Sequence, residues 1–509
     1  MAIIAVVAFH ARLAFFSGGF VGVDVFLVIS GYLIGSLVYR EIRESSFSFG
    51  HFYERRIKRI LPALLTVIFV CNVIAFVLLS PMELIKFCEE SFAAIFSVSN
   101  IYFWLRSNYF NPVTAYKPLL MTWSLGIEEQ FYLLFPLALF VAHKFIKRRM
   151  VQWIIVVVGL SFICNVVCTY VYPSAAFYLL PMRAWELGLG VLIAVHEVGR
   201  DRPVQFGMAA ANVLGCVGLA LIVFPVLAYT ESTGFPGFAA LLPTAGAACL
   251  INSRSSFINK QLLASRPMVF VGLISYSWYL WHWPLLSFAR IVSGGQLSVP
   301  RASLIAVLSL VLAIFSHRYI EQPFRKSVTP TAHLLLGYAT IVLLLAAVSV
   351  LGYVYSGWPS RIPELANVEA TVNKVEHNVC LAGFDESAPR LRPPCVAEGD
   401  GPKLALLGDS HAAALGSAIQ QIAIWHGYGF EQLTKASCPP LPTAPRRWAL
   451  RPKFEKTCAA FNRAVFQHVL SDRSINIIVL AGLWSSLCSD ANSDDCYLDN
   501  RGLGKQALE

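Results

Sequence analysis

The sequence predicts a multispan α-helical membrane domain followed by a smaller, polar α/β domain. Of the 509 residues, 56% are hydrophobic and only 14% are charged, and the mean hydropathy is +0.61. This composition is too apolar for an ordinary soluble enzyme. Apolar runs such as 60–79 and 333–355 are long enough to cross a hydrocarbon core as helices. Such runs recur until about residue 355 and then stop, so we expect the remaining residues to lie outside the membrane.

The basic residues predict how the chain crosses the bilayer. The formal net charge is +10, but the basic residues lie in short loops between apolar runs, where they orient a membrane protein and do not indicate nucleic-acid binding. The five basic clusters lie at residues 40–59, 143–149, 200–202, 254–266 and 318–326. If all five are cytoplasmic, an even number of crossings separates each consecutive pair.

The requirement for an even number of crossings between basic clusters excludes one candidate span. Three apolar segments lie between the first two clusters, and the weakest is 86–104, which carries Lys86, Glu89 and Glu90. We therefore assign it to the outer surface or to a re-entrant element. Ten spans remain, followed by an eleventh, linking span at 333–355. The first run, MAIIAVVAFHARLAFF, has no basic residue before it, so we interpret it as a spanning helix without its beginning and not as a secretory signal.

The polar tail predicts a parallel α/β sheet. KLALLGDS at 403–410, YGFEQLTK and INIIVLAG at 475–482 have strand patterns, and helical patterns separate them. Ligands of such a sheet bind at the carboxyl ends of its strands. Even numbers of cysteines in an exported domain indicate disulfides, and local pairing is the simplest connectivity. The local pairs would be Cys380 with Cys395, Cys438 with Cys458, and Cys488 with Cys496.

Ionisable residues in the membrane zone are rare, so each one is a candidate site residue. His10 lies near the end of the first helix, where it is either interfacial or catalytic. Asp24 lies in GGFVGVDVFLVISGYLIG, whose small residues let a helix or a ligand approach closely. Arg183 and Glu186 have the spacing of an intrahelical ion pair. For these last three residues a structural role is the alternative to substrate binding.

A dense basic cluster and a carboxylate pair also stand out. Arg56 and Arg59 are three residues apart on one helical face and could clamp the phosphates of a nucleotide-bearing donor, although a charge run at a membrane edge is usually topological. Glu128 and Glu129 are adjacent in an apolar stretch and point about 100° apart on a helix. One of them can face a polar cavity while the other lies elsewhere, and the sequence leaves open which.

The stretch GDSH at 408–411 follows a predicted strand and precedes a predicted helix. A turn in that position exposes Ser410 at the carboxyl edge of a sheet, where a base can activate it. Asp409 beside it is a candidate substrate-binding residue. The combination favours a nucleophilic serine over a plain turn.

Several of these stretches, in order, are similar to the acyltransferase-3 membrane family, in its subclass with a fused periplasmic SGNH domain. The matching stretches are FHA at 9–11, GGFVGVDVFLVISGYLI at 18–34, FYERRIKRILPAL at 52–64, TWSLGIEEQFYL at 122–133, MRAWELGLG at 182–190, SYSWYLWHWPLL at 275–286, IEQPFR at 320–325 and LLGDSH. The resemblance implies four segments. These are an acyltransferase-3 domain at 1–327, a linking helix at 328–356, a linker at 357–395 and a truncated SGNH-like domain at 396–509.

The subclass includes bacterial surface-polysaccharide O-acetyltransferases. The resemblance therefore implies a multipass protein of the bacterial inner membrane with a periplasmic C-terminal domain. Its acyl donor would be acetyl-CoA, with no bound cofactor and no metal. Its acceptor would be a hydroxyl of an envelope polysaccharide (O-antigen, exopolysaccharide or peptidoglycan) or a lipid-linked glycan.

The resemblance also implies roles for single residues. His10 matches the essential histidine of the first helix, and Arg56 and Arg59 match the RxxR motif that serves the donor. Glu128 or Glu129 would line the acyl or acceptor path. Ser410 matches the nucleophile that passes the acyl group to a sugar hydroxyl.

The chain departs from the family at several points. Met121 stands where members usually carry His, Trp484 stands where SGNH enzymes often place the oxyanion-hole Asn, and the Asp-x-x-His pair that would activate Ser410 is missing. Members also begin with an Arg-containing segment that this sequence lacks. These departures suggest a copy shortened at both ends. They make an inactive remnant of an acyltransferase one alternative function. The other alternative is a transporter or flippase of lipid-linked saccharides, which would account equally well for the ten spans and the buried charges.

Overall fold

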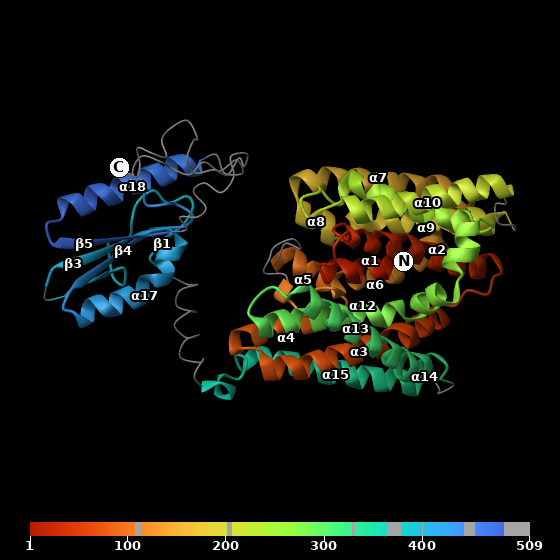
Figure 1. Cartoon of the computed structure of the whole chain (residues 1–509), viewed down its shortest axis with the longest axis horizontal. Helices are drawn as coiled ribbons and strands as arrows, with labels where there is room; N and C mark the ends of the chain where they lie inside the picture. Colours follow the sequence, from red (N-terminus) through yellow and green to blue (C-terminus); the bar gives the residue numbers. More distant parts are fainter. Residues whose placement is uncertain are drawn as a thin grey trace. The chain divides into compact units, whose positions relative to one another are not determined.

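The chain forms two compact units, Met1–Trp358 and Pro359–Glu509, in the computed structural model (Figure 1). The structure describes residues 1–106, 115–200, 206–327, 331–363, 378–399, 401–441 and 453–482. The boundary falls two residues after the predicted end of the linking helix.

The described part of the first unit is helical. In chain order its α-helices are α1 (Ala2–His10), α2 (Gly22–Arg43), α3 (Phe49–Leu78), α4 (Pro81–Ile95), α5 (Ser99–Arg106), α6 (Thr122–Ile146), α7 (Met150–Val171), α8 (Pro173–Tyr178), α9 (Leu180–Gly199), α10 (Met208–Ala228), α11 (Leu241–Asn252), α12 (Arg266–Ser293), α13 (Val299–Ser316), α14 (Gln322–Arg325) and α15 (Thr331–Val354). Short turns of 3₁₀ or π helix join some of them. These are η1 (Gly19–Val21), η3 (Lys147–Arg149), η4 (Gly237–Ala240), η5 (Ile258–Leu263), η6 (His317–Glu321) and η7 (Pro359–Arg361), the last of which opens the second unit.

Among the described residues, seven helical stretches are long and apolar enough to cross a membrane. They include His333–Val354, which lies within the predicted linking span, and Thr122–Val171, which comprises α6, η3 and α7. The first unit is therefore a multispan membrane domain. The count of ten spans before the linking helix stays a prediction.

Helix α3 begins earlier than the apolar run predicted. It starts at Phe49, where the side chain of Ser48 accepts a hydrogen bond from the backbone of the first turn. Arg56 and Arg59 therefore lie inside this helix, in agreement with the prediction that they share one helical face. Two of its charges are compensated, since Arg55 pairs with Glu41 of α2 at 2.8 Å and Lys58 pairs with Glu54 of the same helix at 2.7 Å. The second pair has the i,i+4 spacing that stabilises a helical turn.

The segment predicted to be non-spanning forms two short helices, α4 and α5. They have 15 and 8 residues, and neither is among the seven apolar stretches. A capping box between Ser80 and Glu83 starts α4. The short lengths agree with the expectation that 86–104 does not cross the bilayer by itself.

Glycines bring α2 and α9 into close contact, as the small residues around Asp24 predicted. A Cβ atom on Gly31 would lie 1.9 Å from the carbonyl oxygen of Leu187, and one on Gly190 would lie 2.1 Å from that of Val28. Only glycine fits at such a crossing. The close approach places Asp24 of α2 beside Arg183 of α9.

The second unit contains the predicted parallel sheet. Its strands are β1 (Leu381–Ala382), β2 (Val396–Ala397), β3 (Lys403–Gly408), β4 (Gly429–Lys435) and β5 (Ile475–Ala481), and its described helices are η7 at its start, α17 (Ser410–Trp425) and α18 (Phe454–Ser471). The strand order is β1-β4-β3-β5, with β2 on β4. All pairs are parallel except β2 with β4 (Figure 1). Strand β1 lies within the stretch predicted to be a linker. The sequence did not predict it, because it pairs with β4 over only two residues and has no sequence periodicity.

Two predicted disulfides are confirmed in the second unit. Cys380 is bonded to Cys395 and Cys438 to Cys458. The predicted pair of Cys488 with Cys496 lies outside the described residues, as does Trp484.

Candidate functional site

A cavity of about 320 Å³ lies between α2, α3, α6 and α12 of the first unit. We name it the RxxR cavity. Its polar lining includes Ser30, Arg56, Arg59, Glu128, Tyr132 and Tyr279. The structure thus brings together two arginines and one glutamate that the sequence singled out separately.

Glu128, and not Glu129, lines the RxxR cavity. Its Oε2 accepts a hydrogen bond from the Tyr132 hydroxyl at 2.6 Å and one from the Ser30 hydroxyl at 3.0 Å. Oε1 of Glu129 is buried and has no hydrogen-bond partner among the described residues. The two adjacent carboxylates therefore have different surroundings, which the sequence left open.

The RxxR cavity carries an excess of positive charge. Two arginines, Arg56 and Arg59, and one carboxylate, that of Glu128, are the charged residues of its lining. The Arg56 guanidinium carbon lies 5.8 Å from the centroid of the Tyr132 ring, and its buried Nε has no hydrogen-bond partner among the described residues. Unpaired guanidinium donors beside aromatic rings suit a phosphate-bearing ligand.

A second cavity, of about 740 Å³, lies against the end of α1. We name it the His10 cavity. Its polar and aromatic lining includes His10, Arg12, Tyr116, Glu231, Trp283 and Arg290. Arg12 and Glu231 give it both signs of charge, and Trp283 and Tyr116 give it flat apolar surfaces. Such a mixture of aromatic and hydrogen-bonding groups suits a polar organic acceptor such as a saccharide.

His10 contacts a second histidine, which the sequence analysis did not single out. Nδ1 of His10 lies 3.0 Å from Nε2 of His282, and the two rings are stacked with their centroids 5.2 Å apart. The Trp283 ring meets His10 edge-on at 4.5 Å. Arg290 donates from Nη2 to the carbonyl oxygen of His10 at 2.6 Å. These three contacts of His10 come from α12, and the lone histidine in SYSWYLWHWPLL was the signal for the first of them.

Helix α12 also borders the RxxR cavity. Tyr276 and Tyr279 line that cavity, while Trp283 and Arg290 line the His10 cavity. The Tyr279 hydroxyl lies 2.7 Å from that of Ser124 and donates to the carbonyl oxygen of Met121 at 3.0 Å. The Met121 side chain itself is buried in the apolar core. One helix thus connects the two candidate sites.

Asp24, Arg183 and Glu186 come together as a buried ion triad. Arg183 lies 2.8 Å from Asp24 and 2.9 Å from Glu186, and none of the three side chains is exposed. The predicted pairing of Arg183 with Glu186 is confirmed. None of the three lines the RxxR cavity or the His10 cavity, so the geometry favours the structural alternative to substrate binding.

In the second unit, Ser410 occupies the expected position at the carboxyl end of a strand. Strand β3 ends at Gly408, and Ser410 begins α17 with an exposed side chain. A Cβ atom on Gly408 would lie 1.8 Å from the carbonyl oxygen of Ala481 in β5, so the turn requires glycine. Oδ1 of Asp409 accepts a hydrogen bond from the backbone N–H of His411 at 2.8 Å. Asp409 therefore holds the turn that presents Ser410.

Glu431, His468 and Asp472 of the second unit have the only described arrangement that could suit a metal ion. Lys403 already supplies a cation there, since its Nζ lies 2.9 Å from Glu431 and 3.5 Å from Asp472. The hydrogen bond to Glu431 raises the pKa of Lys403. The cluster is thus an internal ion-pair network at the end of the sheet opposite Ser410.

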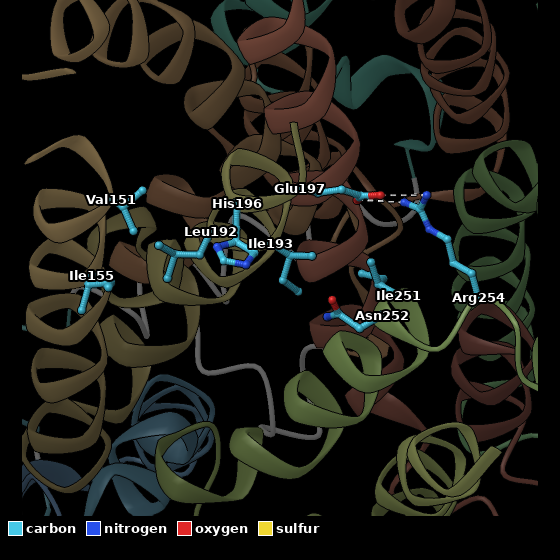
Figure 2. A pocket seen from close by; sticks show the side chains of 9 residues that line it. All are labelled: Val151, Ile155, Leu192, Ile193, His196, Glu197, Ile251, Asn252 and Arg254. Carbon is cyan, nitrogen blue, oxygen red and sulfur yellow. Dashed lines mark hydrogen bonds and ion pairs between the residues drawn. The ribbon is translucent and has the colours of Figure 1, made fainter. Parts of the chain in front are cut away.

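A third hollow, of about 300 Å³, lies on the first unit between α7, α9 and α11. Figure 2 shows aliphatic side chains around it, His196 pointing into it, and the ion pair of Glu197 with Arg254 at one end. It contains none of the predicted site residues. It therefore offers positions for control substitutions away from both candidate sites.

Comparison with known proteins identifies the family. The Acyltransferase domain family (Acyl_transf_3) matches residues 1–318, and the SGNH domain that occurs fused to such domains matches residues 379–507. The chain is 33% identical over 344 residues to O-acetyltransferase OatA of Staphylococcus aureus, a match that covers 64% of this chain and 56% of that protein.

It is also 32% identical over 342 residues to peptidoglycan O-acetyltransferase OatA of Listeria monocytogenes, covering 64% of this chain and 54% of that protein. The chain thus spans about half the length of the curated relatives it matches. No solved structure matches it significantly. On these family matches, and with both domains in the expected order, the chain belongs to the acyltransferase-3 family and carries the SGNH domain that is fused to some of its members.

Proposed function

We propose that this protein is a membrane O-acyltransferase that moves an acyl group from a cytoplasmic acyl-CoA, acetyl-CoA by the family default, to a hydroxyl of a cell-envelope polysaccharide. The names of its relatives include a peptidoglycan O-acetyltransferase, so peptidoglycan is the first acceptor to test. O-antigen and exopolysaccharide are the other acceptors of the same chemical class. The protein would lie in the inner membrane with its SGNH domain in the periplasm.

The observation that carries this proposal is that α12 contributes lining residues to both the RxxR cavity and the His10 cavity. The RxxR cavity holds Arg56 and Arg59, which can bind the phosphates of the CoA moiety by bidentate hydrogen bonds. The His10 cavity holds a histidine, the side chain best suited to take a proton from a hydroxyl near neutral pH. A donor site and a base on neighbouring parts of one unit are what acyl transfer needs.

Charge at the ends of α2 supports the assignment of sides. Its last turn carries Arg40 and Arg43, and its first turn carries Asp24. Basic residues mark the cytoplasmic end of a span, and the RxxR motif follows that end in the sequence. His10 precedes the opposite end of α2. The donor cavity would therefore open toward the cytoplasm and the His10 cavity toward the periplasm.

Ser410 would complete the transfer in the second unit. Its exposed position at the start of α17 suits a nucleophile, because the helix N-terminus stabilises negative charge on an attacking oxygen. In this scheme, the membrane unit delivers the acyl group outward and Ser410 passes it to the sugar hydroxyl.

The experiment that tests the proposal is transfer of radiolabel from [¹⁴C]acetyl-CoA to peptidoglycan in membranes that contain the full chain. The comparison is with His10→Ala and with His196→Ala, which changes a histidine of the third hollow. Label in the glycan with the wild type and His196→Ala, but not with His10→Ala, supports the transferase. No label from a folded and inserted protein on any of the three glycan classes would contradict it and favour the inactive remnant. Unlabelled saccharide that crosses the vesicle membrane would favour the transporter.

A further inference from the structure

The backbone of α12 orients His282. Nδ1 of His282 lies 2.7 Å from the carbonyl oxygen of Tyr279 and 3.2 Å from that of Trp278. A carbonyl oxygen only accepts hydrogen bonds, so Nδ1 of His282 carries a proton and donates it. In a neutral imidazole the other nitrogen, Nε2, is then an acceptor.

The surroundings keep this histidine pair neutral at rest. The His282 side chain has no exposure to solvent, and His10 is 8% exposed. The Arg290 guanidinium already lies against the pair, because it donates to the carbonyl oxygen of His10. A second cation there would be poorly solvated and repelled by the first.

The tautomer of His10 follows from these contacts. Nε2 of His282 is the acceptor, so Nδ1 of His10, 3.0 Å away, must carry the proton of that hydrogen bond. The proton-accepting nitrogen of His10 is then Nε2. We propose that His282 is a positioning residue that fixes this tautomer of His10 and stabilises the imidazolium that forms when His10 takes a proton. This inference rests on the proposed function, in which His10 is the base.

The cavity linings distinguish the two histidines. His10 lines the His10 cavity, whereas His282 lines neither that cavity nor the RxxR cavity. A ligand in the His10 cavity would meet His10, whereas no ligand in either cavity would meet His282. His282 would therefore act through His10 and not on the substrate.

In the proposed acyl transfer, His10 is the only protein group that takes up and returns a proton. The acceptor hydroxyl gives its proton to Nε2 of His10 while its oxygen forms a bond to the thioester carbonyl carbon. The carbon–sulfur bond then breaks, its electron pair leaves on the CoA sulfur, and His10 returns the proton to that thiolate. The products are the acyl ester and the CoA thiol.

While His10 holds the proton, its hydrogen bond to His282 is charge-assisted and stronger. The pair plays the part that histidine and aspartate play in a Ser-His-Asp triad, where the second residue selects the tautomer of the first. Here a neutral imidazole, anchored on two carbonyl oxygens, replaces the carboxylate.

Two variants of His282 separate its role from simple packing. His282→Phe keeps a ring of similar size and removes the acceptor. His282→Gln places an amide oxygen where Nε2 lies and restores an acceptor for the His10 proton. The matched control is His196→Phe, the same substitution in the third hollow (Figure 2).

The first measurement is the ¹⁵N NMR signature of [¹⁵N]histidine-labelled full-length protein in lipid, with His10 assigned by its loss in His10→Gln. We expect the Nδ1–H tautomer of His10 in the wild type and in His282→Gln, and a shift toward Nε2–H in His282→Phe. The second measurement is steady-state acetyl transfer. We expect kcat to fall roughly 100-fold or more in His282→Phe, with KM for acetyl-CoA unchanged, and most of the loss to be recovered in His282→Gln.

The inference is overturned if wild-type His10 carries its proton on Nε2, or if His282→Phe transfers acetyl as fast as His196→Phe. It is also overturned if His282→Gln is as slow as His282→Phe in spite of the Nδ1–H signature. The NMR result does not depend on turnover. An inactive wild type whose His10 shows the Nδ1–H signature would therefore contradict the proposed function and still support the histidine pairing.

Discussion

Asp24 and Arg183 lie 159 residues apart in the chain and 2.8 Å apart in the structure, with no exposure of either side chain. Glu186 shares the same guanidinium at 2.9 Å. The three residues therefore join α2 to α9 by charge, at the place where Gly31 and Gly190 let the two backbones meet. A triad of this kind depends most on its arginine, because removal of Arg183 leaves two buried carboxylates without a cation.

Arg183→Met should be among the most destabilising single substitutions in the first unit. It leaves Asp24 and Glu186 facing each other without a cation, a change that costs about 3–5 kcal/mol when a buried pair is broken. Asp24→Asn should cost less, because the amide keeps the shape and Arg183 keeps Glu186. Thermal unfolding in detergent measures both. The control is Arg254→Met, which breaks the half-exposed pair with Glu197 and should cost about 1 kcal/mol or less. Equal stability of the two Met variants would show that the triad does not hold the helices together.

Glu128→Gln and Glu129→Gln should differ although they change adjacent, isosteric residues. Glu128 lines the RxxR cavity and accepts two hydrogen bonds, so the loss of its charge should lower acetyl transfer by roughly tenfold or more. Glu129 lies outside that lining, and its variant should stay close to the wild type. Steady-state transfer from acetyl-CoA compares the two. A larger loss in Glu129→Gln would mean that the wrong carboxylate has been assigned to the cavity.

Arg56→Gln and Arg59→Gln should raise KM for acetyl-CoA more than they lower kcat, because binding of the CoA phosphates is present in both the ground state and the transition state. Arg56→Lys should restore only part of the affinity, since a lysine cannot make the bidentate contact. Arg55→Gln is the matched control, because Arg55 pairs with Glu41 and lies outside the RxxR cavity. Titration with acetyl-CoA at two salt concentrations gives the measurement. An equal rise of KM in all three Gln variants would indicate a general surface charge effect.

Ser410→Ala should leave acetyl-CoA binding by the membrane unit intact and abolish acetylation of the glycan. The hydroxyl is exposed at the start of α17, so its removal does not disturb the core of the second unit. The measurement combines acetyl-CoA binding with label recovered in the polysaccharide, and Ser417→Ala on the same helix is the control. Acetylated glycan from Ser410→Ala at the wild-type level would make the second unit a scaffold.

The second unit should lose stability in acid. Hydrogen bonds from Arg390 lower the pKa of Glu386, and those from Ser474 lower the pKa of Asp472. A carboxylate with a lowered folded pKa contributes stability above its unfolded pKa and loses it as the pH falls through the folded value. Both contributions should therefore decline below about pH 4. Hydrogen–deuterium exchange of its peptides in urea, corrected for intrinsic rates, follows the change in the full chain. The double variant Glu386→Gln with Asp472→Asn should flatten the profile, and an unflattened profile would assign the acid effect to other groups.

The sequence predicted the helices of the first unit because a bilayer permits few other structures for apolar runs of that length. It also predicted the α/β sheet from alternating strand and helix patterns. It did not predict the start of α3 at Phe49, because the first turns of that helix are basic and depend on partners such as Glu41. It missed β1 and β2 because two-residue strands have no period and exist only by pairing with β4.

The candidate site residues, like the helices and strands, could be predicted from the sequence only where a local pattern marks them. The sequence could name His10 because it is an ionisable residue in an apolar run, and Arg56 because it belongs to a dense basic cluster. It could not decide between Glu128 and Glu129, since the orientation of a helix depends on the packing around it. It did not find His282, whose partner lies 272 positions earlier in the chain. A contact of that range leaves no local pattern.

Helix α12 determines how the RxxR cavity and the His10 cavity are oriented around its axis, because it contributes residues to both linings. Tyr279 lines the RxxR cavity, and three residues later on the same helix His282 contacts His10, which lines the His10 cavity. A one-residue insertion between them would rotate all later side chains by about 100° and turn His282 away from His10, while Tyr279 kept its place. The number of residues between Tyr279 and His282 therefore determines how the RxxR cavity and the His10 cavity are placed around α12.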